Sequence, residues 1–600
     1  MSKLASQPNN ATGISGSLDA VYERTEDCLE RAIKSFDSKI VEGPPGGGKT
    51  TTAFKIASRS SEAFVYLTKR EDLYEQGERL SDEFDLSHEI IPSPHRDCPS
   101  FDEDSPQFDP EAKSLYDFGV NAARIHAELD LDCSPNCEYM QKWETFDDDP
   151  ADIIIGHYKH AYLSSLIEDR IVIIDEFPGG AFEREFNNAD AMISRFLRSV
   201  DRIPFDDFLD LIENRDDLDR VKAVYAWFRR NGVGTDDRTI IEANENDRYH
   251  TLAPFLTYTV LNTIKNGNGF EVPWFNLTGI EAGFEESSPF SGLETERLAA
   301  VDREQQSIHV LTPPDLSGAR GVVGLDGTPT PMMWELATGE DFDHLSVLDR
   351  EKEMSAYVRD FLGVTVKQTN EHLKPYHGGH ITENRDEAIL YGVEVKEGQK
   401  PALIAPEKAL EAYREAGILD RTGLSMNYAQ VLSSNDFKGE PVGVIHGAPH
   451  PGNQPVKKWA AYFGIPVDGE GEGMNKTYGE FGDEIYRHFV HNQVLQAILR
   501  FGRGESDATV YVNTAAIPDD SIEVDSMANP ELFNSPNKRK IADHLRDAGA
   551  DGATKKDLKK TAEIESMTTV ENILYDFRDK GLVEDEVVPG PYPTVYRWSR

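Results

Sequence analysis

The 600-residue chain has few cysteines and no long apolar run. Its four cysteines are too few for a disulfide scaffold, so we expect a reducing, cytoplasmic environment. No apolar run approaches the roughly 20 residues of a membrane-spanning helix, so no membrane role is expected. Residues 1–20 are polar and small and lack the apolar segment of a secretion signal, which predicts a flexible N-terminal tail.

Basic residues are also scarce. The chain carries 62 lysines and arginines against 107 acidic residues, a formal net charge of −45 spread along its whole length. Such a surface either repels nucleic acid or keeps a protein soluble in concentrated salt, where charges are screened within about 3 Å at 1 M. We favour the second interpretation and expect a halophilic archaeon, or one of its mobile elements, as the source.

A glycine-rich segment carries the clearest chemical signal. Residues 43–50 read G-x-x-x-x-G-K-T, after the apolar pair Ile40-Val41 and before a helix-compatible segment at 50–58. In such a loop, glycines let backbone N–H groups surround a polyphosphate, and the helix that follows points its positive end at the same anion. A glycine-rich surface turn is the alternative, which the flanking strand and helix disfavour. The predicted nucleotide-binding residues are Gly43, Gly46, Gly48, Lys49, Thr50 and Thr51, with Lys49 on the β/γ-phosphates and Thr50 on Mg²⁺.

Two acidic residues form the predicted partner of this loop. The buried strand 171–174 delivers Asp175 and Glu176 at its carboxyl end, where α/β folds place ligands. Asp175 is expected to hold Mg²⁺, directly or through water, and Glu176 to orient and deprotonate the attacking water. Acidic residues at a strand end are common, so this assignment depends on the loop upstream.

A third element lies far along the chain. Residues 496–503 predict a helix on which Gln496, Arg500 and Arg503 share one face. Two guanidinium groups aimed at a γ-phosphate stabilise the charge that develops during its transfer, an effect of about 10³–10⁵ in rate. A solvated helix face is the alternative, but the apolar neighbours indicate a packed segment.

Alternating apolar runs and helix-compatible segments predict an α/β fold with parallel sheets. We expect one α/β domain at 21–335, a second at 336–528 and a small domain at 535–600. The first is expected to contain a cysteine-bearing insertion near 90–150 and a helical insertion near 180–310. The predicted strands are 63–67, 152–155, 171–174, 321–325, 402–405, 429–432, 441–445 and 508–512.

Together these elements resemble a superfamily 2 helicase, and the finer pattern resembles the XPD/DinG family of iron–sulfur DNA helicases. The order of the motifs is the family's, and the resemblance spans about residues 30–520. It implies two RecA-like P-loop domains with ATP in the cleft between them, the first supplying Lys49, Thr50, Asp175 and Glu176. Further family-like segments are 65–71, 151–158, 325–331, 433–437, 444–451 and 496–503.

The sequence departs from this family at three motifs. Its "DEAH" is Asp175-Glu176-Phe177-Pro178, without the histidine that helps to couple hydrolysis to DNA. Its "SAT" is Asp326-Gly327-Thr328, and Leu499 replaces the glycine of the last motif. Nucleotide hydrolysis fits these residues better than processive unwinding does.

The cysteines form a candidate metal site. The family binds a [4Fe–4S] cluster with four cysteines in this interval, whereas this chain has Cys98, Cys133 and Cys137 there and Cys28 upstream. A cluster would need Cys28 or a histidine, either His95 or His126, as the fourth ligand. Zinc held by three cysteines and one histidine is equally good chemistry, and buried thiols without a metal are the third alternative.

The last 60 residues resemble a winged helix. Three helices are expected at 538–547, 555–562 and 567–580, the last two capped by Thr554 and Ser566, followed by two strands. Between Lys538 and Lys560, eight basic residues face four acidic ones, a local reversal of charge that suits DNA phosphates. Winged helices also mediate contacts with proteins.

We therefore expect an ATP-hydrolysing DNA helicase or translocase that uses ATP and Mg²⁺ on single-stranded and forked DNA. The resemblance implies 5′→3′ movement, with the two insertions forming a pore that splits the duplex. Replication, repair or transcription proteins are expected partners through the winged helix. Two alternatives remain: a DNA-binding regulatory or replication ATPase that switches without unwinding, and a phosphotransferase without a DNA role, which leaves Arg500 and Arg503 unexplained.

Overall fold

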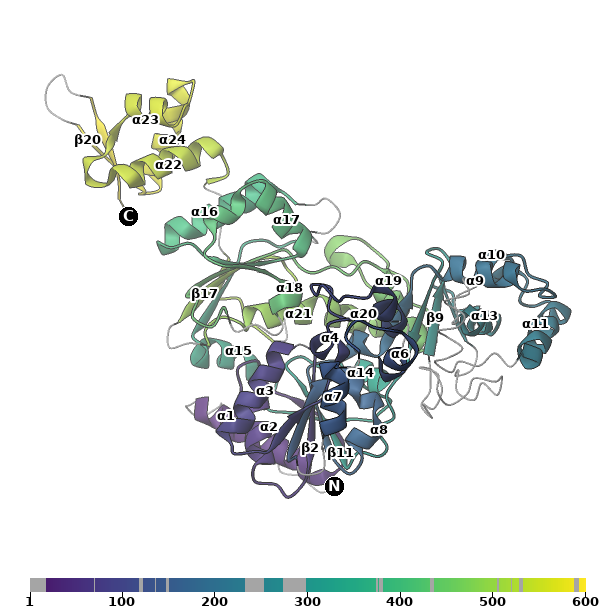
Figure 1. The fold of residues 1–600 in the computed structure, drawn as a ribbon. Helices are drawn as coiled ribbons and strands as arrows, with labels where there is room; N and C mark the ends of the chain where they lie inside the picture. Colours follow the sequence, from purple (N-terminus) through teal and green to yellow (C-terminus); the bar gives the residue numbers. More distant parts are fainter. Residues whose placement is uncertain are drawn as a thin grey trace, which may run out of the picture. The chain divides into compact units, whose positions relative to one another are not determined.

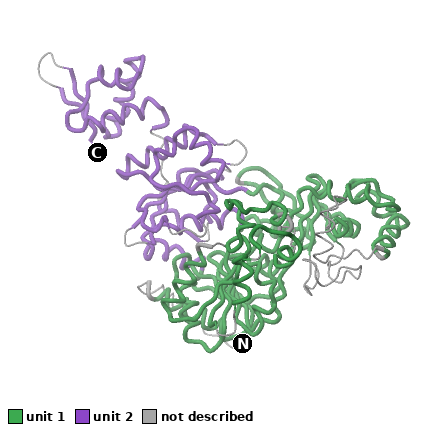
Figure 2. Tube along the Cα trace, in the orientation of Figure 1, with its two compact units in different colours: residues 1–349, 451–488 green, residues 350–450, 489–600 purple. Residues whose placement is uncertain are grey.

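The computed structural model divides the chain into two compact units (Figure 2). Unit 1 comprises residues 1–349 and 451–488, and unit 2 comprises 350–450 and 489–600. Residues 1–17 of the predicted N-terminal tail lie outside the described residues. The structure describes residues 18–69, 71–117, 122–134, 136–146, 151–231, 253–273, 298–373, 376, 381–431, 436–503, 507–518, 521–527, 533–587 and 593–599.

Unit 1 is built on a seven-stranded parallel sheet of order β12-β1-β11-β5-β2-β4-β3. Figure 1 labels β2 and β11 of this sheet and several helices of the same domain. The inner strands of the sheet are continuous apolar runs, as strands buried on both faces require. Because β1 lies beside β11 and β11 beside β5, the residues that follow these strands emerge at one edge of the sheet. The strands are β12 (Asp343–Ser346), β1 (Ser38–Glu42), β11 (Gly321–Asp326), β5 (Ile171–Asp175), β2 (Phe64–Thr68), β4 (Ile153–His157) and β3 (His88–Ile90), and helices include α1 (Leu18–Ser35), α2 (Lys49–Ala57), α3 (Glu71–Glu83), α8 (Ser164–Ile167) and α14 (Pro331–Thr338).

The first insertion consists of short helices with a small core of their own. Phe101, Ile125 and Tyr139 are buried there together with the three cysteines of this segment. A core this small contributes little burial energy, so the segment depends on other interactions to hold its helices together. The helices are α4 (Pro94–Asp97), α5 (Pro110–Asp117), α6 (Ala122–Glu128) and α7 (Glu138–Thr145).

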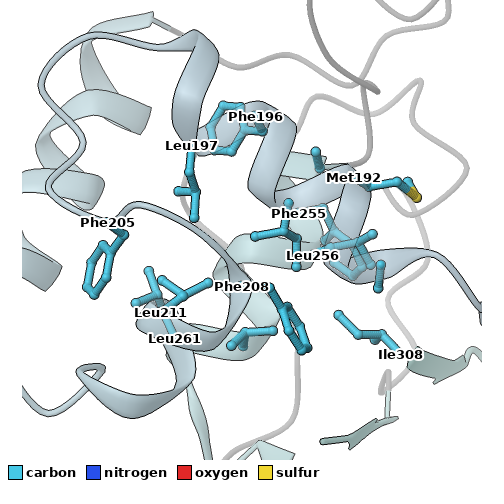
Figure 3. Packing of buried hydrophobic residues seen from close by; sticks show 14 of the residues in the cluster. Met192, Phe196, Leu197, Phe205, Phe208, Leu211, Phe255, Leu256, Leu261 and Ile308 are labelled. Atoms are coloured by element: carbon cyan, nitrogen blue, oxygen red, sulfur yellow. The ribbon is translucent and has the colours of Figure 1, made fainter. Parts of the chain in front are cut away.

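The second insertion is mixed, so the prediction of a helical insertion at 180–310 was wrong. Among the described residues of this insertion, four helices pack on a five-stranded antiparallel sheet of order β6-β10-β9-β8-β7. Figure 3 shows Ile308 near Phe208 and Phe255 of the helices, all three in one buried cluster. The strands were missed because they are short. The elements are β6 (Glu183–Phe186), α9 (Ala189–Ser199), α10 (Phe208–Glu213), α11 (Leu218–Asn231), α13 (Ala253–Leu261), β7 (Thr263–Lys265), β8 (Phe270–Pro273), β9 (Leu298–Asp302) and β10 (Ser307–Leu311).

Residues 451–488 belong to unit 1 although they interrupt unit 2 in the sequence. They carry α19 (Gln454–Tyr462) and all but the last residue of α20 (Gly479–Phe489). The side chain of Asn268 donates to the carbonyl of Lys457 at 3.1 Å, and Lys458 pairs with Glu183 at 2.6 Å. Residues 451–488 and β12 were predicted to belong to the second domain at 336–528, but the structure assigns both to unit 1.

Unit 2 contains a six-stranded parallel sheet of order β15-β14-β16-β17-β13-β18. The strand predicted at 429–432 is instead the helix α18 (Tyr428–Val431), where Gln430 donates its backbone N–H to the Asn427 side chain at 2.9 Å. The strands are β15 (Ser425–Asn427), β14 (Ala402–Ala405), β16 (Val442–His446), β17 (Ala508–Asn513), β13 (Val364–Gln368) and β18 (Ser526–Met527), with helices α15 (Met354–Ala356), α16 (Glu383–Glu397), α17 (Glu407–Glu415) and α21 (His491–Ile498).

The C-terminal part of unit 2 has three helices and a small antiparallel sheet of order β19-β21-β20. Thr554 and Ser566 cap the second and third helices, as predicted. Arg539 is 5% exposed and joins this part to α16 through Glu387 at 2.6 Å. These elements match the predicted ones, while the winged-helix assignment stays a prediction. They are α22 (Pro536–Ala548), β19 (Ala553–Thr554), α23 (Lys555–Thr561), α24 (Met567–Asp579), β20 (Val583–Glu586) and β21 (Val595–Trp598).

Candidate functional site

The glycine-rich loop runs from β1 into the N-terminus of α2. Gly46 and Gly48 have φ values of 83° and 76°, which residues with a Cβ rarely adopt. A Cβ at Gly43 would lie 2.9 Å from the aliphatic carbons of Lys49. Glycine is therefore favoured at these positions, and the loop leads directly into the N-terminus of α2, where the helix dipole favours an anion.

The two polar side chains after the loop occupy different environments. Lys49 is 7% exposed, and its Nζ donates to the carbonyl of Gly43 at 2.7 Å. The hydroxyl of Thr50 donates to Oδ2 of Asp175 at 2.8 Å, which joins the loop to the end of β5. Thr51, also predicted to bind nucleotide, is exposed on α2.

Asp175 is the centre of a buried hydrogen-bond network. The hydroxyl of Tyr66, on β2, donates to Oδ2 of Asp175 at 2.5 Å. The hydroxyl of Tyr158 donates to the carbonyl oxygens of Asp175 at 2.5 Å and of Glu176 at 3.1 Å. The orientation of the Asp175–Glu176 turn is thus fixed by two phenols. They belong to the family-like segments 65–71 and 151–158, but the sequence did not place them at the nucleotide site.

Glu176 has an unusual backbone conformation for a residue with a side chain. Its φ is 67°, and its N–H donates to the carbonyl of Leu325 at 2.7 Å. Such strain costs on the order of 1–3 kcal/mol and is retained where the surrounding structure enforces it. The carboxyl group of Glu176 interacts with that of Asp326, the last residue of β11.

Asp326 is a third acidic side chain at this edge. It is 2% exposed and accepts hydrogen bonds from the N–H of Thr328 at 2.8 Å and from the indole of Trp334 at 2.9 Å. The sequence placed it in a motif but not at the nucleotide site.

Burial dominates the electrostatics of these carboxyl groups. It raises the pKa of Asp175, and the charge of Glu176 adds to this, against the opposing hydrogen bonds from Tyr66 and Thr50. Burial also raises the pKa of Asp326, while its hydrogen bonds and the Lys49 charge lower it. A divalent cation placed between Thr50 and Asp175 would favour the ionised form of the carboxyl group.

Phe177 and Pro178 stand where the family has the last two residues of "DEAH". The Phe177 ring contacts Trp334, Trp459 and His488, with centroid separations of 5.8, 5.8 and 4.8 Å. This aromatic cluster packs the 451–488 segment against the Asp175–Glu176 turn. Pro178 offers no side-chain group that could replace the missing histidine.

The helix predicted at 496–503 is shorter than expected, so the three side chains do not share one helix face. Helix α21 ends at Ile498, and Gly502 follows with a φ of 68°. Gln496 and Arg500 remain adjacent, with the Arg500 guanidinium 3.5 Å from the Gln496 amide oxygen. Arg503 lies beyond the turn, where its Nε donates to the carbonyl of Leu499 at 2.7 Å and satisfies an orphan carbonyl at the helix end.

Other predicted motif residues are only partly described. Lys69 is exposed after β2, whereas Arg70 and residues 433–435 lie outside the described residues. His446, at the end of β16, is buried and contacts the Asn513 amide at 3.0 Å.

The structure brings together three of the four cysteines. Cys98, Cys133 and Cys137 lie with His126, and their four ligand atoms are all within 4.8 Å of one another. Of the two predicted histidines, His95 instead packs its ring against Phe101 and Tyr116. Cys28 lies on α1, where its thiol is 3.9 Å from the carbonyl of Ser346.

The sequence missed Tyr66, Tyr158 and Asp326 as residues of this site. Each lies on or next to an apolar strand, where a polar group needs a partner. A polar residue in an apolar strand indicates that its side chain forms a hydrogen bond. It does not identify the partner, because the order of the strands in the folded sheet determines which side chains are neighbours.

No family model and no curated protein match the chain. The chain is similar to a solved structure described as "XPD_Helicase", at 12% identity over 82% of this chain and 95% of that one, with a TM-score of 0.43. It is also similar to "Structure of S. tokodaii Xpd4", at 12% identity over 84% and 100% of the two chains, with a TM-score of 0.36. Likenesses this distant carry no argument about activity, which has to come from the residues.

Proposed function

We propose that this chain is an ATP-dependent DNA helicase or translocase. The observation that carries the proposal is the contact between Thr50 and Asp175 beside Lys49, at the carboxyl edge of a parallel sheet. This is the arrangement that holds the phosphates and Mg²⁺ of a nucleoside triphosphate.

Each residue of this edge has a proposed task. Lys49 and the loop N–H groups bind the β- and γ-phosphates, and Thr50 and Asp175 hold Mg²⁺. Glu176 orients the attacking water and accepts its proton. Bound Mg²⁺ neutralises charge that develops on the phosphate oxygens.

Arg500, Arg503 and Gln496 are proposed to complete this site from unit 2. Arg500 is 7% exposed and Gln496 is 3% exposed, so both are held in place by packing rather than extended into solvent. Fixed guanidinium groups stabilise a transition state better than mobile ones because they need little reorganisation. ATP binding would then close the two units on each other and hydrolysis would release them.

We propose that the protein moves along DNA. The C-terminal helices carry exposed Lys540, Lys556 and Lys560, for which no ion pair with another described residue is found. Alternating grip on a single strand converts the closing motion into movement.

Strand displacement tests the proposal. The chain should separate a forked duplex when supplied with ATP and Mg²⁺, and Lys49→Ala should abolish both displacement and ATP turnover. Lys55→Ala is the matched control, because Lys55 is an exposed lysine on the same helix that pairs with Glu26 away from the loop. Wild-type turnover in Lys49→Ala would reject the site.

A second candidate is supported by Phe177 and Pro178. Because the histidine that couples hydrolysis to DNA is missing, the chain would act as an ATP-switched DNA-binding regulator. DNA-stimulated hydrolysis without strand displacement would favour this function. Hydrolysis that ignores DNA would favour a phosphotransferase instead.

A further inference from the structure

The four ligand atoms of the cysteine cluster lie at the separations of a single coordination shell. The thiols of Cys98 and Cys133 are 3.6 Å apart, and Nε2 of His126 is 3.3 Å from Cys98 and 3.2 Å from Cys137. Around one tetrahedral zinc ion, with bonds of 2.3 Å to sulfur and 2.0–2.1 Å to nitrogen, ligand atoms lie about 3.5–3.8 Å apart. The observed separations fit that shell with small adjustments.

A four-iron cluster does not fit the same residues. Each thiolate of such a cluster binds a different iron and points away from the centre, which puts the ligand atoms roughly 6 Å apart. The four atoms here are all within 4.8 Å of one another. Cys28, the remaining cysteine, cannot enlarge the set, because it lies on α1 against Ser346.

The surroundings of His126 prepare it as a ligand. Its Nδ1 is 2.6 Å from the carbonyl of Ala122, which fixes the proton on that nitrogen and leaves Nε2 to face the thiols. Its ring is stacked between Phe101 and Tyr139. The neighbouring carboxylate of Asp97 is already bound by Arg96 and Lys142, so it does not compete for the ion.

We propose that Cys98, His126, Cys133 and Cys137 bind one zinc ion, in place of the iron–sulfur cluster that the family resemblance implies. The ligands lie at the end of α4, on α6, in the loop after it and at the start of α7. One ion therefore ties together the helices of an insertion whose own core is small. Its task is structural, since four protein ligands leave no position for a substrate.

Metal analysis of the full-length chain, purified without added metal, tests this proposal. We expect about one zinc per chain, no acid-labile sulfide and no broad visible absorption. Cys133→Ser should lose the zinc, whereas Cys28→Ser, which changes a buried thiol outside the cluster, should keep it. Iron in place of zinc, no bound metal, or equal zinc content in both variants would overturn the proposal.

A second measurement covers the case in which Cys133→Ser fails to fold. X-ray absorption at the zinc edge of the wild-type chain should give three sulfur ligands at about 2.3 Å and one nitrogen at about 2.0 Å. Removal of the ion by a chelator should expose residues 90–146 to proteolysis first, while the β1–α2 loop stays protected. A shell of four sulfurs, or uniform proteolysis along the chain, would contradict the assignment.

Discussion

At the scale of single residues, Tyr66 shows what a local pattern leaves out. It is fully buried in an apolar strand, and its hydroxyl shares Oδ2 of Asp175 with Thr50. The sequence predicted the loop and Asp175 because both lie in short, contiguous motifs. It could not predict Tyr66, since β2 and β5 pair only in the folded sheet.

Tyr66→Phe removes one of the two side-chain donors that orient Asp175. We expect a free energy of unfolding lower by about 1 kcal/mol and a higher Mg²⁺ concentration for half-maximal ATP hydrolysis. A Mg²⁺ titration of the steady-state rate measures this. Tyr428→Phe is the control, because Tyr428 also donates to a buried acceptor, the carbonyl of Gly447 in unit 2. Equal Mg²⁺ dependence in the two variants would contradict the role of Tyr66.

The buried side chain of His488 makes the stability of unit 1 depend on pH. Burial lowers the pKa of His488 to about 4, against about 6.5 when unfolded. As the pH falls below 6.5, the unfolded chain takes up the proton first, so stability is lost between about pH 6.5 and 4. At pH 5 this loss amounts to about 2 kcal/mol.

His488→Asn removes this titration and keeps a polar group near the hydroxyl of Thr330. The loss of unfolding free energy between pH 7 and pH 5, measured with urea, should shrink by about 2 kcal/mol. His157 and His160 also have lowered pKa values, but they are present in both proteins and cancel. An unchanged difference between the two pH values would refute the assignment.

At the scale of elements, the end of α21 shows that a single glycine can end a helix which the periodic pattern predicts to continue. The spacing of Gln496, Arg500 and Arg503 fits a helix, and a short pattern contains no sign of where the helix stops. Gly502 supplies that stop, because a Cβ there would lie 2.2 Å from the carbonyl of Leu362. The residue types of the site were predictable, whereas the backbone that presents Arg503 was not.

Gly502→Ala should therefore displace Arg503. We expect ATP turnover to fall at least tenfold while nucleotide binding, which depends on unit 1, changes little. Stopped-flow binding of a fluorescent nucleotide and steady-state turnover separate the two effects. Gly417→Ala is the control, since Gly417 has a similar φ of 70° but nothing within 4 Å of the added Cβ. Full turnover in Gly502→Ala would show that the turn does not position Arg503.

At the scale of the whole molecule, the division into units follows packing rather than sequence order. Residues 451–488 follow β16, the fourth strand of the unit 2 sheet along the chain, but their helix α19 packs on β8 and β9 of unit 1. The alternation of apolar runs and helix-compatible segments predicted both parallel sheets, because each buried strand forms an apolar run that the sequence shows without knowledge of its neighbours. It could not assign this segment, whose partners lie about 200 residues away.

The distribution of charge over the whole chain predicts which residues bind DNA. The formal charge of −45 opposes DNA binding, so affinity should depend on the few exposed lysines. Lys556→Ala with Lys560→Ala should weaken binding to single-stranded DNA and reduce its salt dependence by about one to two released ions. Lys538→Ala with Lys555→Ala is the matched control, because these lysines pair with Asp576 and Glu571. Equal losses in both pairs would argue against a DNA-binding face on α23.

The halophilic interpretation belongs to the same scale and stays a prediction. Across the described part of the chain, no helix has the length and hydropathy needed to cross a bilayer.

We infer that single-stranded DNA controls ATP hydrolysis at the Lys49–Asp175 edge of unit 1. Steady-state ATP hydrolysis by the full-length chain, with and without single-stranded DNA, tests it most directly. We expect the rate to rise at least tenfold with DNA and to disappear in Lys49→Ala. A folded protein that hydrolyses ATP at the same rate with and without DNA would contradict it.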